Sequence, residues 1–112
     1  MKAGNLNNLV LFQTWREGYD AAGQPAGSWH DYMSMRGNVV YLRGEERWAA
    51  AQVQAEGTIT LEFRYNRALF RRLRKGLDRI RAMIGDRVCD ISDYRDPDGR
   101  RKRLHLEVKE RL

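Results

Sequence analysis

The sequence predicts a mainly β protein, a small antiparallel β-barrel or sandwich of six or seven strands with one short inserted helix. Three observations support this prediction. The length of 112 residues fits a single domain, residues 1–112, with one hydrophobic core. Residues 58–65 and 101–109 alternate between apolar and polar side chains, which is the period of a strand with one buried face. Gly and Pro turn signals separate most apolar segments, as in strands joined by hairpins.

A long hairpin is expected near the N-terminus. Residues 9–16 are rich in β-forming side chains, and residues 28–36 form a second strand. Between them, residues 18–27 contain three Gly and one Pro, which predicts an exposed turn region. The hairpin tip is rich in Gly and Ala, so it is not expected to have a core of its own.

The second strand of this hairpin predicts which face is buried. Trp29, Met33 and Met35 share one parity, so they lie on the same side of a regular strand. Gly37 is a candidate for a β-bulge that bends the strand before the apolar residues 39–42.

A helix is predicted over residues 45–54, which are Ala-rich and contain neither Gly nor Pro. Two Glu residues at its start suit the positive end of the helix dipole. The arginine-dense residues 66–75 are expected to contain a further helical turn or two, because Ala68, Leu69 and Leu73 have helical spacing.

The remaining chain is predicted to form strands joined by tight turns. The predicted strands are residues 58–65, 77–84, 87–93 and 101–109. Gly85-Asp86 and Asp96-Pro97-Asp98-Gly99 are the turn signals between them. The expected inward residues are Ile59, Leu61, Phe63, Tyr65, Ile80, Ala82, Ile84, Cys89, Ile91, Leu104, Leu106 and Val108.

Positive charge is concentrated in one part of the chain. The 21 Lys and Arg residues and 15 Asp and Glu residues give a net charge of +6. Residues 64–103 alone hold 14 basic and 6 acidic side chains, a difference of +8. Such a segment is either a solvated surface or a DNA- or partner-facing one, since Arg recognises phosphates and carboxylates. The candidate residues are Arg67, Arg71, Arg72, Arg74, Lys75, Arg79 and Arg81.

Enzymatic activity, a metal site and a cofactor are not expected. His30 and His105 are the only histidines, and Cys89 falls at an inward strand position, where a thiol acts as a small hydrophobe. The acidic residues between positions 90 and 98 surround a turn and lack the spacing of a calcium loop. No apolar segment has the length of a membrane span or a signal peptide, so synthesis into a cytosol-like compartment is expected.

The three tryptophans, Trp15, Trp29 and Trp48, are numerous for so short a chain. Stacking on nucleic-acid bases is one role for such residues. Packing in the core or at a subunit interface is favoured, because two of the three lie on amphipathic elements.

Several segments, taken in order, resemble the head–tail joining proteins of long-tailed double-stranded DNA phages, also called head closure or head–tail adaptor proteins. The chain departs from that family at residues 66–81, where a longer arginine-rich segment replaces a shorter Pro- and Gly-containing link. The matching segments are Met1–Leu6, Phe12-Gln13, Asp20–Pro25 before Trp29, LRGEERWAAAQVQAE at 42–56, Arg64-Tyr65, Gly85–Val88 with Ile91, and Asp96–Arg100.

The resemblance implies a small β-barrel that forms a cyclic homo-oligomer in the virion connector. This ring would close the DNA-filled head and receive the tail, with the protein in the host cytoplasm before assembly. The implied partners are other copies of the chain, the portal and adaptor proteins of the head, the tail terminator protein and packaged DNA held by sequence-blind phosphate contacts. No membrane partner and no catalysis are implied.

Two functional hypotheses therefore come from the sequence, a structural connector ring and a small β-barrel regulator that binds nucleic acid. A connector is expected to form rings or bind portal-complex proteins, whereas a regulator binds free nucleic acid with a steep salt dependence. The candidate ring or partner contacts are Tyr19, Asp20, Gln24, Pro25, Arg47 and Trp48.

Overall fold

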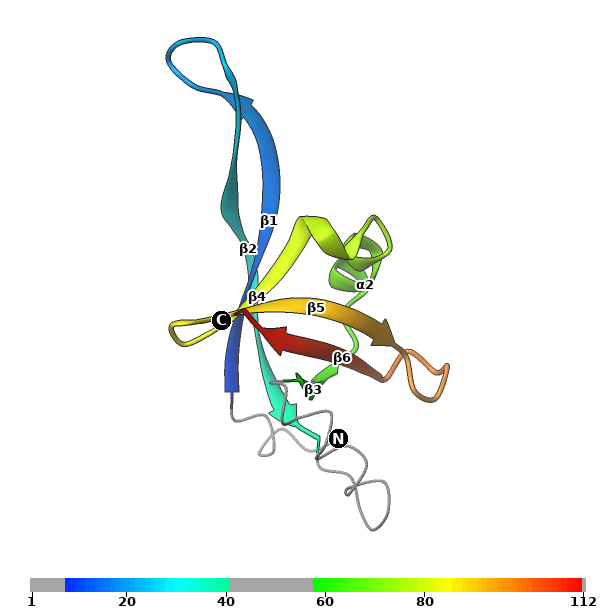
Figure 1. Cartoon of the computed structure of the whole chain (residues 1–112). Coiled ribbons are helices and arrows are strands. Elements are labelled where there is room, and N and C mark those ends of the chain that lie inside the picture. The colour runs from blue at the N-terminus through cyan, green and yellow to red at the C-terminus, as the bar shows by residue number, and fades with distance from the viewer. Residues whose placement is uncertain (1–7, 41–57, 112) are drawn as a thin grey trace.

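Six antiparallel strands close into a barrel in the order β1-β2-β3-β6-β5-β4 (Figure 1). This computed structural model describes residues 8–40 and 58–111. The predicted β-barrel is confirmed, with six strands among these residues. The elements are β1 Asn8–Tyr19, β2 Pro25–Val39, β3 Thr58–Arg64, α2 Arg67–Leu73, the 3₁₀ helix η2 Leu77–Arg79, β4 Ile80–Ile84, β5 Arg87–Arg95 and β6 Arg103–Glu110.

The barrel interior is filled by the alternating apolar residues of the strands. Most of the inward positions predicted for β3 to β6 are confirmed as buried, whereas Ile59, Tyr65 and Ile84 are only partly buried. The Phe12 and Phe63 rings pack with their centroids 5.6 Å apart. The side chains below 5% exposure are Val10, Phe12, Leu61, Phe63, Leu69, Leu73, Ile80, Ala82, Cys89, Ile91, Leu104, Leu106 and Val108.

Helix α2 follows β3 and adds two leucines to the barrel core. Asn66 caps it, because its side-chain Oδ1 accepts a hydrogen bond from the backbone N–H of Leu69 at 2.9 Å. Leu69 and Leu73 are buried four residues apart on one helix face, whereas Ala68 is exposed. The prediction of a helical turn in this segment is thereby confirmed. The helix predicted over residues 45–54 lies outside the described residues.

The first two strands extend well beyond the barrel, as predicted for a long hairpin. Strands β1 and β2 pair along twelve positions, from Asn8 with Gly37 to Tyr19 with Pro25. Strand β4 pairs with β1 only as far as Thr14, so the distal half of the hairpin projects on its own (Figure 1). We call residues 15–30 the arm; every one of them is exposed or half-exposed.

A β-bulge in β2 separates the arm from the barrel. Phe12 pairs with Met33 but Gln13 pairs with Asp31, so Tyr32 is the extra residue. The bulge predicted at Gly37 is wrong: pairing there is regular. Gly37 is instead buried where a Cβ would lie 2.4 Å from the Phe63 ring, so the core requires a residue without a side chain.

The bulge also reverses which residues of β2 point inward, so the alternation on the arm side of Tyr32 is opposite to that on the barrel side. Met33 and Met35 lie opposite the buried Phe12 and Val10, whereas Trp29 lies opposite Trp15 on the outer face. The prediction that Trp29 shares a face with the two methionines is therefore wrong, because one extra residue reverses the alternation beyond it. Neither Trp15 nor Trp29 is in the core, and Trp48 lies outside the described residues.

Tight turns connect the C-terminal strands as predicted. Gly85 and Gly99 have φ angles of 63° and 67°, which is the left-handed conformation that glycine adopts without a steric penalty. No helix among residues 8–40 and 58–111 is long and apolar enough to cross a membrane.

Candidate functional site: the arm and the basic groove

Two of the seven predicted basic residues hold the arm against the barrel. Arg81 donates from Nε to Oε1 of Gln13 at 2.8 Å, and its guanidinium carbon lies 4.4 Å from the centroid of the Trp29 ring. Arg79 forms an ion pair with Glu17 on the arm. These arginines therefore have partners within the chain.

The charges at this junction alter each other's ionisation. Hydrogen bonds from Arg79 and from the Trp15 ring lower the pKa of Glu17, because both stabilise its carboxylate. Partial burial lowers the pKa of Arg81, and the positive charge of Arg111 acts in the same direction. Glu17 is therefore held ionised by its neighbours, whereas Arg81 is partly covered where it lies over the Trp29 ring.

Arg72 is a third arginine whose side chain is bonded within the chain. Its Nη2 donates to the backbone carbonyl of Arg79 at 2.8 Å, which ties α2 to η2. Its Nη1 is buried, with no hydrogen-bond partner in the described part of the chain. Arg72 is thus half-buried between two elements and is not part of an open basic surface.

The other arginines of α2 line a groove between the helix and the β5–β6 turn. This basic groove has a volume of about 240 Å³. Two aromatic residues, Tyr65 and Phe70, also line it, with their ring centroids 5.5 Å apart, and Phe70 packs in turn on Tyr94 at 5.5 Å. Its four guanidinium groups come from Arg67, Arg71, Arg74 and Arg101.

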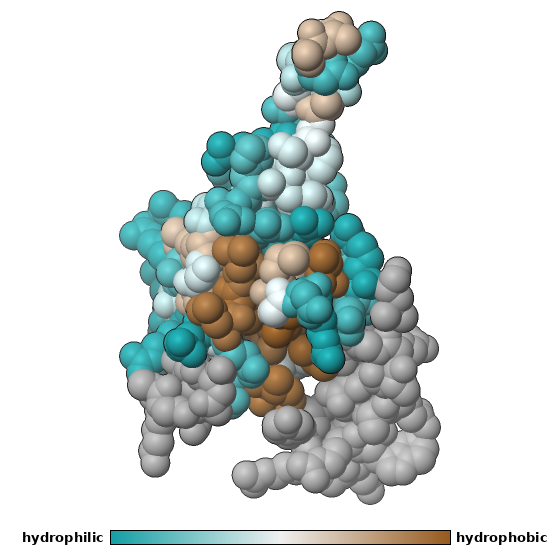
Figure 2. Space-filling view, turned by 90° about the vertical axis from the view of Figure 1, so that its left-hand side faces the viewer, coloured by the Kyte–Doolittle hydropathy of each residue, from teal (hydrophilic) through white to brown (hydrophobic). Residues whose placement is uncertain are grey.

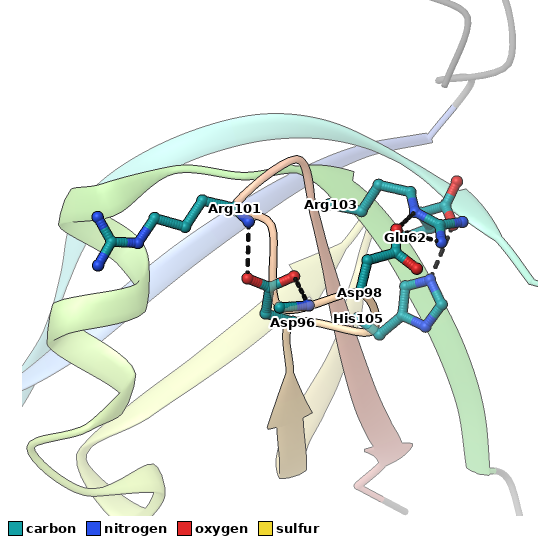
Figure 3. Close-up of polar contacts among 7 residues, drawn as sticks. Glu62, Asp96, Asp98, Arg101, Arg103 and His105 are labelled. Atoms are coloured by element: carbon teal, nitrogen blue, oxygen red, sulfur yellow. Dashed lines mark hydrogen bonds and ion pairs between the residues drawn. The ribbon is translucent and has the colours of Figure 1, made fainter.

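Arg101 is a groove residue that sequence reasoning did not include. It lies beyond the 66–81 segment and reaches the groove only because the β5–β6 turn folds back beside α2 (Figure 3). Its backbone has a φ of 57°, the one non-glycine residue with positive φ among those described. The dense run of basic residues that follows Gly99 is the signal in the sequence that could have identified it.

The groove is positively charged because four arginines line it against one carboxylate, and that carboxylate is hydrogen-bonded to the backbone rather than paired with an arginine. Asp96 accepts the backbone N–H of Gly99 at 3.1 Å with one oxygen and that of Arg101 at 2.8 Å with the other (Figure 3). Over residues 8–40 and 58–111, no ion pair involves Arg67, Arg71, Arg74 or Arg101. The groove is therefore suited to an anionic group from outside the chain.

A chain of polar contacts fixes the β5–β6 turn that forms the groove wall. Arg103 contacts Asp98 at 2.7 Å and Glu62 at 3.3 Å, and Glu62 also accepts from His105 at 2.8 Å (Figure 3). The hydrogen bond from Arg103 lowers the pKa of the Asp98 carboxyl. These contacts connect the turn to β3 and β6, and they hold in place the loop that carries Arg101.

The predicted partner contacts of the hairpin lie together at the arm tip. Tyr19 is 79% exposed. Asp20 accepts the backbone N–H groups of Ala22 and Gln24 with its Oδ1, each at 2.9 Å, which fixes the turn before Pro25. Arg47 and Trp48 lie outside the described residues, and Lys75 is exposed beyond the end of α2.

The residues considered for catalysis are dispersed. Cys89 is buried in the barrel, and desolvation raises the pKa of its thiol. His30 lies 2.9 Å from the Ser28 hydroxyl on the exposed arm, whereas His105 contacts Glu62 on the barrel. Across the described ranges, no group of three or more His, Cys, Asp or Glu side chains is arranged to hold a metal ion.

Comparisons with known proteins agree with this fold. Protein SF1141 from Shigella flexneri 2a, solved in solution, superposes with a TM-score of 0.64 at 23% identity, covering 98% of this chain and 96% of that chain. A chain from the virion of a native gene transfer agent particle superposes with a TM-score of 0.60 at 17% identity, covering 96% of both chains. No curated protein matches. The model of the phage head completion proteins matches residues 1–111, and the chain therefore belongs to the phage head completion protein family.

Proposed function

We propose that this chain forms a ring in the connector of a phage particle, where it closes the DNA-filled head and joins it to the tail. The family gives the chain a structural role in the phage head and a place in the virion. A role of this kind requires no catalysis. The proposal adds the ring, the closure of the head and the contact with the tail to that family role.

The observation that carries the proposal is the projecting arm. It extends beyond the last pair between β1 and β4, contains no buried residue, and ends in a highly exposed Tyr19. A projecting hairpin without a core is poorly explained by stability alone, whereas it fits contact with a neighbouring protein. The partners we propose are further copies of the chain, the portal and adaptor proteins, and the tail terminator protein.

The exposed basic residues support a second kind of contact. Arg67, Arg71, Arg74 and Lys75 are exposed and have no ion-pair partner among the described residues, in contrast to the internally bonded Arg72, Arg79 and Arg81. In a connector the available anions are packaged DNA and acidic protein surfaces. A ring repeats each charge in every subunit, so weak single contacts would add together.

Shortening the arm tests this function. Asn-Gly in place of residues 19–25 would join Gly18 to Ala26, which are paired in register, through a two-residue hairpin turn. The barrel core is untouched, so the shortened chain should unfold at the same denaturant concentration as the wild type. Electron microscopy of lysates should show DNA-filled heads and free tails, with few joined particles.

A matched control changes the opposite turn. Asp86→Ala alters the exposed β4–β5 turn, which contributes to neither the arm nor the basic groove, and should leave joining normal. Normal numbers of tailed particles from the shortened variant would contradict the proposed role of the arm.

A further inference from the structure

We infer that the arm tip of one subunit seats in the basic groove of the next subunit, so that repeated arm-into-groove contacts close the ring. This inference rests on the proposed ring and names the contact that holds it together. It makes the occupant of the groove a second copy of this chain.

The tip and the groove are complementary in charge. Between Gly18 and Gly27 the sequence has one ionised side chain, Asp20, and no Lys or Arg. The groove presents four arginines, and its own Asp96 is occupied by backbone amides. Asp20 uses only Oδ1 within its turn, which leaves Oδ2 without a partner among the described residues. A guanidinium group can donate a charge-assisted hydrogen bond to that oxygen.

The tip and the groove also match in their aromatic residues. Tyr19 precedes Asp20 and is 79% exposed, the most exposed of the large apolar side chains described. Tyr65 and Phe70 line the groove, so the docked tip would place an aromatic ring beside a carboxylate next to aromatic rings beside arginines. A DNA duplex presents a convex surface of phosphates, and it has no exposed aromatic ring to pack against Tyr65 and Phe70.

The arm cannot fill the groove of its own subunit. Its base is fixed by Arg79 and Arg81, and the Tyr32 hydroxyl donates to the carbonyl of Ala68 on α2 at 3.3 Å. From that base the paired strands lead away from α2, and the tip lies at the far end of the molecule (Figure 1). Two different patches on one subunit then give a heterologous contact, which closes into a ring by rotation.

The tip is ordered before it binds. The Asp20 N–H donates to the Gln24 carbonyl at 2.9 Å, and the Gly23 N–H donates to the Asp20 carbonyl at 3.0 Å. Together with the two bonds to Asp20 Oδ1, these contacts fix the turn in the free subunit. Little conformational entropy is then lost on docking.

Disulfide trapping in assembled particles tests the contact. One cysteine replaces Ala22 at the tip and another replaces Arg71 in the groove, in a Cys89→Ala background that removes the native thiol. Oxidised particles should give a ladder of linked multimers on a denaturing gel without reductant. The matched controls, Ala22→Cys alone and Arg71→Cys alone, should give no ladder.

A charge exchange tests the same contact without a crosslink. Asp20→Arg places like charges together and should lower the yield of tailed particles about tenfold. Adding Arg71→Asp should restore the yield to within about threefold, because it recreates an opposite pair. Asp86→Arg makes the same change of charge at the β4–β5 turn and should have no effect.

The outcomes separate the inference from the proposed function. Absence of the ladder in particles that contain the chain in normal amount would overturn the inference and leave the connector role intact. Absence of the chain from purified particles would defeat the proposed function, and the inference with it. Unchanged joining by Asp20→Arg, together with loss of duplex binding on changing Arg67, Arg71 and Arg74 to Gln, would assign the groove to DNA and also overturn the inference.

Discussion

The arm is the extension of two of the six barrel strands, β1 and β2, but the two regions differ in how far their side chains are buried. Within the barrel, Val10 and Phe12 of β1 are fully buried, whereas beyond Thr14 the same strand has no buried residue. On the face shown in Figure 2 the strongly hydrophobic residues lie on the barrel, whereas the arm above it carries hydrophilic and weakly hydrophobic residues. The barrel therefore carries the stability of the fold, whereas the side chains of the arm remain exposed to solvent.

The junction between these regions depends on polar and aromatic contacts. Trp15 and Trp29 meet edge to face with centroids 5.4 Å apart, and Arg81 lies over the Trp29 ring. Such contacts are individually modest compared with burial of a core side chain. Substitutions in the barrel, at the junction and in the arm should thus differ in how much they lower the free energy of unfolding and in which part of the molecule they affect.

The largest effect is expected from a core truncation. Phe63→Ala removes a fully buried ring that packs on Phe12, and should lower the free energy of unfolding by about 3–5 kcal/mol. Tyr19→Ala at the arm tip removes an exposed ring and should change it by less than about 0.5 kcal/mol. Urea unfolding followed by tryptophan fluorescence measures both, and similar losses would contradict the division between barrel and arm.

Two glycines sharpen the comparison, because an added methyl group would meet an aromatic ring at each. The new Cβ would lie 2.4 Å from the Phe63 ring at Gly37 and 2.1 Å from the Trp15 ring at Gly27. Phe63 is enclosed by the core, so Gly37→Ala should cost about 1–3 kcal/mol. Trp15 is half-exposed and can move aside, so Gly27→Ala should cost less. An equal loss of unfolding free energy would show that the arm is packed as tightly as the barrel.

The junction should give a smaller effect that is local to the arm. Arg81→Ala removes the hydrogen bond to Gln13 and the contact with Trp29, and should cost about 1 kcal/mol. Hydrogen exchange of residues 15–30 should accelerate more than exchange in β5 and β6. Arg16→Ala, on the exposed part of the arm, is the control and should leave exchange unchanged.

The smallest effect is expected from pH. Glu17 has a lowered pKa in the folded protein, so its pairing with Arg79 stabilises the junction above the ordinary glutamate value of 4.5. As the pH falls below that value and through the lowered pKa, the stabilisation should be lost, and exchange of the arm amides should rise. Titration of the Glu17 carboxyl by NMR gives the pKa directly. Glu17→Gln should remove the dependence, and its persistence in that variant would assign it to another carboxyl group.

Much of the fold follows from the sequence, because its signals are local. Alternation identified the buried residues Leu61 and Phe63 of β3 and Leu104 of β6, and turn chemistry identified Gly85 and Gly99. Each of these depends on a few neighbouring residues and on the two-residue period of a strand. The family resemblance, read from short segments in order, was confirmed by the match over residues 1–111.

The site was less predictable, because it depends on contacts between distant residues. The sequence identified a basic segment, and the tertiary structure divided it: Arg79 and Arg81 meet the arm, whereas Arg71 and Arg74 line the groove. Arg101 lies outside residues 66–81, and it lines the groove only because the β5–β6 turn lies beside α2. Charge density shows where positive residues are numerous and does not show which of them find partners.

The sequence by itself determined the inward faces of β3, β5 and β6 and the turns at Gly85 and Gly99, since the side chains that decide them are close in the chain. It did not predict that residues 77–79 form the 3₁₀ helix η2 or that β1 and β2 continue to Tyr19 and Pro25. Only the tertiary structure decided the register of β1 against β2, and with it the bulge at Tyr32. One additional residue reverses the alternation, so Trp29 lies outside with Trp15 and Arg81 while Met33 lies inside. The physical reason is that alternation gives the period of a strand, whereas pairing with a neighbour fixes its phase.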